Sequence, residues 1–79
     1  MWYLDAYENK SELLAKSYPL QGATSTTIEE LIGTNEESGP IEAAMHEVAL
    51  ADLPRFARYI DGKLLIDLGC TYFVGLFAD

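Results

Sequence analysis

Basic residues are scarce in this sequence. Its 79 residues include five Lys and Arg against thirteen Asp and Glu, which gives a formal net charge of −8 at pH 7. A protein that binds nucleic acid through the phosphates needs clustered cations that displace the condensed counterions. The scarcity of cations therefore excludes direct nucleic-acid binding by this route.

Cysteine and histidine occur once each, as Cys70 and His46. A single cysteine cannot close an intrachain disulfide, which excludes a small disulfide-stapled scaffold and favours the reducing cytoplasm. Structural zinc sites use about four Cys or His ligands, so no metal site is predicted. A thiol–imidazole pair of Cys70 and His46 is an alternative, but a free cysteine in an apolar segment usually packs as a small hydrophobic residue.

Motifs of catalysis are missing as well. The sequence has no Gly-x-Ser-x-Gly elbow, no glycine-rich phosphate-binding loop and no acidic loop with EF-hand spacing. Thirteen carboxylates place some pair at the spacing of glycosidase acids by chance, so such a pair indicates nothing. The sequence predicts a protein that is not an enzyme and that needs no cofactor.

Long hydrophobic runs are also absent. The most apolar stretch, residues 64–78, is interrupted by Asp67, Gly69 and Gly75 and is shorter than the ~20 residues of a membrane span. The first residues carry acids instead of the Lys or Arg of a secretory signal. The hydrophobic content of 49% is nevertheless too high for a disordered chain. We expect one folded domain over residues 1–79, located in the cytoplasm and not in a membrane.

Alternating residues predict an N-terminal hairpin. Residues 2–8 and 12–20 are rich in Tyr, Trp and Leu, and the polar residues Asn9-Lys10-Ser11 form the turn between them. Pro19 is expected to end the second strand. One face of the first strand is apolar and consists of Trp2, Leu4 and Ala6. The other face is more polar and consists of Tyr3, Asp5 and Tyr7.

Two short helices are expected in the middle of the chain. Thr26 or Thr27 is predicted to cap the first helix, since Thr26 and Glu29 have capping-box spacing, and Gly33 is predicted to end it. Residues 34–40 are predicted to form a solvated loop with a mobile tip. Asp52 is predicted to cap the second helix, whose buried stripe is Leu53, Phe56, Ala57 and Ile60.

The remaining segments predict strands. Residues 41–50 fit both a helix and a strand, and a short strand at 45–50 is preferred. Residues 63–68 and 72–78 predict a C-terminal hairpin around Gly69-Cys70-Thr71. The sequence thus predicts an α+β fold: a small antiparallel sheet, made of the N-terminal hairpin, a short middle strand and the C-terminal hairpin, with two short helices on one face.

Negative charge is concentrated in the middle of the chain, where no basic residue occurs between Lys16 and Arg55. Like charges repel and destabilise a compact state, so their concentration favours a surface that attracts a cationic partner. The alternative is a solvated acidic face that only serves solubility. Abundant tyrosine also favours an interface, because exposed tyrosine is a frequent anchor of binding. The candidate partner-binding residues are Glu29, Glu30, Glu36, Glu37, Glu42, Glu47 and Asp52.

The order of segments resembles that of a known group of proteins. The chain runs from an aromatic first strand to a strand ending in Tyr18-Pro19-Leu20, a helix with Glu29-Glu30-Leu31-Ile32-Gly33, an acidic loop, a helix with Leu53-Pro54-Arg55-Phe56 and an aromatic final hairpin. This layout resembles small bacterial immunity proteins, the cytosolic antidotes of contact-dependent growth inhibition and colicin-type toxins. The resemblance implies a domain that binds a cognate toxin, often a basic nuclease, and covers its active or substrate-binding surface. It implies no catalytic residue.

Two other functions fit the same charges. One is a phage-type inhibitor that imitates nucleic acid and blocks a restriction or CRISPR complex. The other is a cytosolic interaction domain whose acidity only keeps it soluble. A nucleic-acid mimic should bind several cationic enzymes, whereas an antidote should bind its cognate toxin alone. For both inhibitors the expected partner is a basic protein. The oligomeric state is not predicted, because an uncovered edge strand could pair with a second copy of the chain.

Overall fold

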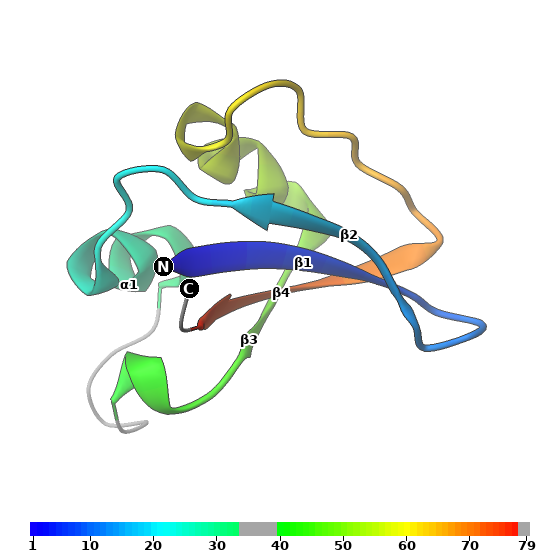
Figure 1. The fold of residues 1–79 in the computed structure, drawn as a ribbon, viewed down its shortest axis with the longest axis horizontal. Coiled ribbons are helices and arrows are strands. Elements are labelled where there is room, and N and C mark those ends of the chain that lie inside the picture. The colour runs from blue at the N-terminus through cyan, green and yellow to red at the C-terminus, as the bar shows by residue number, and fades with distance from the viewer. Residues whose placement is uncertain (34–39, 78–79) are drawn as a thin grey trace.

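The computed structural model describes residues 1–33 and 40–77. Within them the chain forms a four-stranded antiparallel sheet with strand order β2-β1-β4-β3, together with an α-helix and two 3₁₀-helices (Figure 1). The predicted α+β class, with its antiparallel sheet and short helices, is confirmed. The strands are β1 (Trp2–Glu8), β2 (Leu14–Pro19), β3 (His46–Val48) and β4 (Cys70–Leu76), and the helices are α1 (Ser25–Ile32), η2 (Ile41–Ala43) and η3 (Leu50–Tyr59).

The predicted N-terminal hairpin is confirmed. Strands β1 and β2 pair antiparallel, with Leu4 opposite Tyr18, and Pro19 is the last residue of β2. The connection is longer than the predicted three-residue turn, because β2 begins only at Leu14. The register of the pair also shifts between Ala6 and Tyr7, as at a β-bulge.

One face of the sheet is covered by the helices. Leu4 on β1 and Val74 on β4 are fully buried, and they share one core with Ile28 of α1 and Phe56 of η3. Because side chains alternate between the faces of a strand, the inward face of β1 is the apolar face that the sequence predicts. Both predicted helices therefore pack on the same side of the sheet.

The cap of helix α1 lies two or three residues before the predicted cap. The side chain of Thr24 accepts a hydrogen bond from the backbone N–H of Thr27 at 3.2 Å, so Thr24 is the N-cap and the predicted cap at Thr26 or Thr27 is wrong. The prediction that Gly33 ends the helix is confirmed, since Gly33 has a left-handed φ of 69° and its N–H bonds the carbonyl of Glu29.

The middle and the end of the chain differ from the sequence prediction in two respects. The predicted strand at residues 45–50 is present but spans only His46–Val48. The predicted C-terminal hairpin is absent from the described structure, because residues 63–68 form no strand and β4 instead lies between β1 and β3. The predicted loop at 34–40 lies, apart from Pro40, outside the described residues.

Tyrosine hydroxyls take the place of the missing strand partner. The N–H of Leu65 bonds the Tyr18 hydroxyl at 3.3 Å, and the N–H of Asp67 bonds the Tyr72 hydroxyl at 2.8 Å. Both hydroxyls also donate to the carbonyl of Leu65, at 3.5 and 3.0 Å. The segment between η3 and β4 is therefore tied to the core by side chains, which give hydrogen-bond partners to the N–H groups of Leu65 and Asp67 and to the carbonyl of Leu65.

Candidate functional site

The predicted acidic residues are spread over several elements. The structure places Glu29 and Glu30 on α1, Glu42 on η2, Glu47 on β3 and Asp52 on η3. Glu36 and Glu37 lie outside the described residues. Glu47 pairs with Phe73 in the sheet and, by alternation, projects from the face opposite to the helices. Its carboxylate and those of α1 are therefore on different sides of the molecule.

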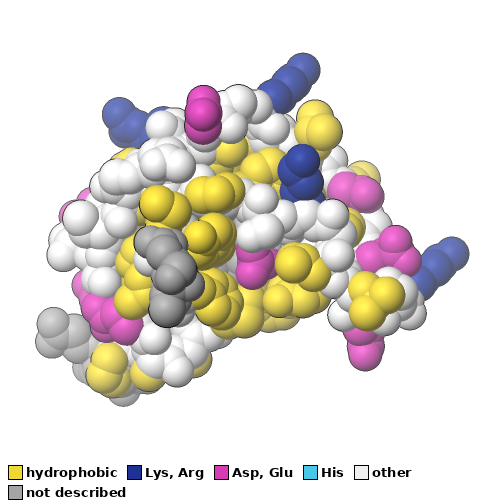
Figure 2. All heavy atoms as spheres, in the orientation of Figure 1, with side chains coloured by type: hydrophobic (Ala, Val, Ile, Leu, Met, Phe, Trp, Pro, Cys, Tyr) yellow, Lys and Arg dark blue, Asp and Glu magenta, His cyan; other side chains and the backbone are white. Residues whose placement is uncertain are grey.

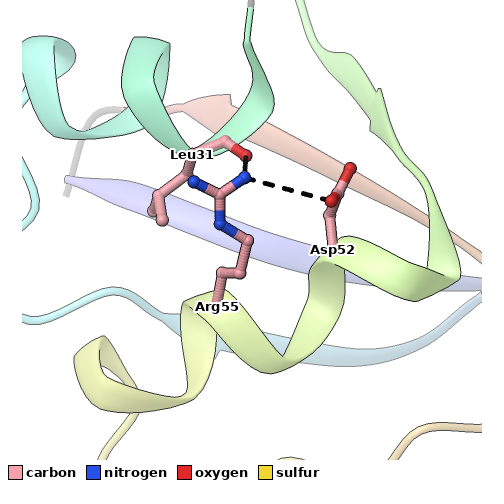
Figure 3. A network of polar contacts seen from close by, with 3 residues as sticks. All are labelled: Leu31, Asp52 and Arg55. Carbon is pink, nitrogen blue, oxygen red and sulfur yellow. Dashed lines mark hydrogen bonds and ion pairs between the residues drawn. The ribbon is translucent and has the colours of Figure 1, made fainter.

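Asp52 is partly neutralised by a neighbour. Its carboxylate lies 4.0 Å from the Nη1 atom of Arg55, and the same Nη1 donates to the carbonyl of Leu31 at 3.3 Å (Figure 3). The predicted capping role of Asp52 is wrong, because η3 begins at Leu50 and no side chain caps it. The guanidinium of Arg55 instead stabilises the C-terminal end of α1, where helix carbonyls lack partners within the helix.

Replacing Arg55 with alanine should lower the free energy of unfolding by about 1 kcal/mol, because the variant loses a charged contact at a helix C-terminus. Urea denaturation of the variant and the parent chain measures the difference. Arg58→Ala is the matched control, since Arg58 is an exposed arginine of the same helix whose contact, within the described residues, is with the Tyr59 ring and not with a carbonyl of α1, so a smaller loss is expected. Equal loss of stability in the two variants would contradict this role of Arg55.

The surface between α1 and η3 carries both signs of charge. A hollow there is lined by Glu30 of α1 together with Arg55 and Arg58 of η3.

Glu42 lies near the other end of α1. The hydroxyl of Ser25 and a backbone N–H hold the pKa of the Glu42 carboxyl below its usual value. A lowered pKa means that Glu42 contributes stability at neutral pH that is lost on acidification. The helical side of the molecule is therefore not the uniformly acidic surface that the charge pattern predicts.

The opposite, outer face of the sheet is rich in aromatic side chains. Tyr7 packs edge to face against Phe73, with ring centroids 5.8 Å apart, and Tyr3 packs in the same way against Phe77 at 6.0 Å. Tyr3, Tyr7 and Phe73 are half-buried, and 40% of Phe77 is exposed. Figure 2 shows hydrophobic side chains gathered over the strands, with acidic side chains among them and at their margins.

Gly75 allows the side chains on this face to come close together. A Cβ atom at this position would lie 3.0 Å from Met45 Cγ and 3.1 Å from the Phe77 ring. Such contacts are too short, so a larger residue would push Met45 and Phe77 apart. Glycine in a central strand often marks such a close approach.

A buried carboxylate lies on the same face. Asp5 is only 6% exposed and accepts a hydrogen bond from the Ser17 hydroxyl at 2.5 Å. Phe73 is its partner across the β1–β4 pair, and Ser17 is its partner on β2. The outer face therefore combines aromatic rings with a carboxylate held in the sheet.

An apolar hollow opens at one end of this face. It is a groove of about 450 Å³ whose apolar lining comes from Tyr7, Phe73 and Met45. Glu8 and Glu12 bring carboxylates to its lining. Glu8 ends β1, and the loop that follows it and carries Glu12 is held by bonds from the Glu8 N–H to the Leu13 carbonyl and from the Glu12 N–H to the Glu8 carbonyl. The remaining lining residues are Asn9 and Thr71.

Comparison with known families places the chain in one of them. Residues 1–75 match a family described as a domain of unknown function, DUF7683. The chain belongs to the DUF7683 family. Searches of curated proteins and of solved structures give no match.

The tyrosines of this DUF7683 domain are evident from its sequence, but the surface that they form is not. Of the tyrosines that favoured an interface, Tyr18 and Tyr72 are buried in the core. Tyr3 and Tyr7 belong to the outer face, as the alternation in β1 indicates. The sequence does not reveal the groove, because Tyr7 and Phe73 are far apart in the chain and come together only through the β1–β4 pairing. Glu8 and Glu12 were missed because they lie outside the acidic middle of the chain.

The histidine and the cysteine of the DUF7683 domain do not form a pair. His46 Nε2 is hydrogen-bonded to the carbonyl of Ile41 at 2.8 Å, and His46 lies opposite Val74 on β4. Cys70 is four residues from Val74, which is about 13 Å along a strand. The alternative of a Cys70–His46 pair is therefore wrong. Within residues 1–33 and 40–77, no group of three His, Cys, Asp or Glu side chains is arranged to hold a metal ion, and no helix reaches the length and apolar character of a membrane span.

Glu12 is held in an unfavourable backbone conformation. Its φ is 61°, and it is the one non-glycine residue with positive φ among the described residues. The left-handed conformation costs an ordinary residue about 1 kcal/mol. Glycine adopts this conformation without the cost.

Replacing Glu12 with glycine should raise the free energy of unfolding by about 0.5 to 1 kcal/mol, because the strain is relieved while some chain entropy is lost. Glu12→Ala removes the same carboxylate without relieving the strain and is the matched control. Chemical denaturation of the two variants separates the effects. A glycine variant no more stable than the alanine variant would contradict the interpretation.

Proposed function

We propose that this DUF7683 domain is an immunity-type protein of the cytoplasm, which binds a basic protein toxin and neutralises it by covering its active or substrate-binding surface. The observation that supports this proposal is the half-exposed aromatic face of the sheet, which carries carboxylates in a chain of net charge −8. Aromatic side chains that are partly exposed supply rigid apolar contact area, which is typical of the centre of a protein interface.

In this proposal, different parts of the domain attract the toxin from a distance and bind it on contact. Carboxylates spread over the elements still sum to a negative potential, which accelerates the approach of a basic partner before contact. The outer face of the sheet then supplies the apolar contact that slows dissociation. The distribution of Glu29, Glu42 and Glu47 over several elements is therefore compatible with steering, although it does not form one patch.

A nuclease is the toxin class that best fits an acidic antidote. An enzyme that cleaves nucleic acid has to present cations to the phosphates of its substrate. An acidic protein that covers those cations excludes the substrate and needs neither a cofactor nor a catalytic residue for this action. We expect the complex to weaken as salt screens the charges.

Co-expression tests the proposed function. The protein encoded beside this chain is produced in a laboratory bacterium with and without the DUF7683 domain, and growth is followed. We expect growth inhibition by the neighbouring protein, restoration of growth by the domain and a stoichiometric complex on size-exclusion chromatography. An unrelated acidic protein of similar size and charge should restore nothing.

Two results would contradict the proposal. Undiminished toxicity in the presence of the folded domain would show that it is not an antidote to that protein. Inhibition of several unrelated nucleic-acid enzymes by the purified domain would instead support the nucleic-acid mimic, since an antidote is expected to act on its cognate toxin alone.

A further inference from the structure

We propose that the groove lined by Tyr7, Phe73, Met45, Glu8 and Glu12 receives an arginine side chain of the basic partner. This inference rests on the proposed function, because it assigns a contact site to the basic protein that the domain binds. It identifies the outer face of the sheet, rather than the acidic helix α1, as the docking surface.

The apolar wall of the groove suits the flat face of a guanidinium. Cations bind aromatic rings within about 6 Å of the ring centroid, and arginine does so more often than lysine. The chain already uses this interaction twice within itself, with Lys16 5.7 Å from the Tyr18 ring centroid and Arg58 5.8 Å from that of Tyr59. In the groove, Tyr7 and Phe73 offer rings with no basic residue among the lining side chains.

The charge of the groove favours a cation from the partner. Glu8 and Glu12 are both exposed at its rim, and Glu47 projects from the same face of the sheet next to Phe73. Lys10 is exposed in the loop between Asn9 and Glu12, but it is not among the residues that line the groove. An arginine from the partner would complement the carboxylates, and its planar guanidinium can bind a carboxylate through two parallel hydrogen bonds.

The size of the groove is sufficient for a side chain and the backbone next to it. Its volume of about 450 Å³ lies within the range of about 300 to 1,000 Å³ that is typical of ligand-binding pockets. The groove is also well supported, because the β1–β4 pairing runs from Trp2 to Glu8 without a break in register. An incoming arginine would therefore meet walls that are largely formed in advance, which lowers the entropic cost of binding.

A short peptide tests the groove without the natural partner. The probe is acetyl-Gly-Arg-Gly-amide, titrated into the ¹⁵N-labelled full chain at low ionic strength, with the citrulline peptide as the uncharged isostere. We expect saturable shifts of the amide signals of Tyr7, Glu8, Thr71 and Phe73, and at least about tenfold weaker binding of the citrulline peptide. Equal binding of the two peptides, or shifts confined to α1 and η3, would overturn the proposal. Equal binding of the lysine peptide would overturn the assignment to arginine.

Matched charge variants locate the site. Glu8→Gln with Glu12→Gln should weaken binding of the arginine peptide at least about tenfold, because the groove loses both rim carboxylates. Glu29→Gln with Glu30→Gln removes the same number of charges from α1 and should change binding less than about twofold. All four positions are at least partly exposed, so both variants should keep the fold, which the amide spectrum checks. Equal effects of the two double variants would show that only the net charge of the domain affects binding, which would overturn the assignment of the arginine to the groove.

Dilution of the free chain tests for a different occupant. If the signals of the groove amides move between millimolar and micromolar protein, a second copy of the chain covers this face and the proposal is wrong. We expect no such movement. Failure of the peptide to bind while co-expression still restores growth would overturn the groove alone, whereas failure of co-expression with a binding peptide would overturn the proposed antidote function alone.

Discussion

Replacing both Tyr18 and Tyr72 with phenylalanine is expected to lower the free energy of unfolding by about 3 kcal/mol. The two hydroxyls make four hydrogen bonds to the backbone of Leu65 and Asp67. Each such bond contributes about 0.5 to 1.5 kcal/mol, and we expect the lower part of this range because the segment is partly exposed. A chain of this length has a total stability of only about 4 to 12 kcal/mol, so the loss is large.

Urea denaturation and hydrogen exchange measure this loss together. The amides of Leu65 and Asp67 should lose their protection in the double variant, because both bond a tyrosine hydroxyl. Tyr59→Phe is the control, since within the described part of the chain the Tyr59 hydroxyl makes no hydrogen bond and its removal should change little. Retained protection at residues 65 and 67 in the double variant would refute the anchoring role of the hydroxyls.

The stability should also depend on alkaline pH through Tyr72. Burial raises the pKa of the Tyr72 hydroxyl above its usual value of about 10. A pKa that is higher in the folded state means that the contribution is complete below the unfolded value and is lost as the pH rises through the folded value. Tyr72→Phe should remove this part of the pH dependence.

Cys70 in the folded protein is expected to react with iodoacetamide at least about 100-fold more slowly than in urea, because the reaction needs both the thiolate and access to it. The side chain is only 7% exposed. Burial, and then the negative charges of Asp67 and Glu8, raise the pKa of the Cys70 thiol. Mass spectrometry after timed alkylation gives the two rates.

A charge variant tests the electrostatic part of this protection. Asp67→Asn should lower the pKa of Cys70 and speed its alkylation, whereas Asp61→Asn, a charge change at another position of the same segment, should leave the rate unchanged. Equal rates for the native and the unfolded chain would contradict the buried position of the thiol. An unchanged rate in Asp67→Asn would assign the protection to burial alone.

Local patterns in the sequence predict the N-terminal half of this fold. The alternation in residues 2–8 indicates a strand with one buried face, and Gly33 indicates the end of a helix, because each signal depends on neighbouring residues. The start of α1 is displaced because Thr24 and Ser25 precede Thr26 and Thr27, and all four are suitable caps. Packing of Ile28 into the core selects among them.

Long-range pairing explains what the sequence did not predict. Residues 63–68 alternate like a strand, but Tyr18, 47 residues away from Leu65, bonds their backbone instead. Strand β4 was expected to pair with these residues, yet it pairs with β1 and β3. No local sequence pattern indicates which distant strands will pair. The groove depends on this pairing, because its residues come from different strands. The acidic residues could be counted from the sequence, but their distribution over different sides of the sheet could not.

The position of β4 affects how the domain is made in the cell. This strand lies between β1 and β3, and its residues 70–76 are synthesised after every other strand. Until they leave the ribosome, β3 has no neighbour in the sheet and the aromatic wall supplied by Phe73 does not exist. Folding of this sheet therefore has to wait for residues 70–76 and depends on contacts between distant segments, which slows it. Nascent chains that stop short of β4 should be substrates for chaperones and proteases rather than partial binders.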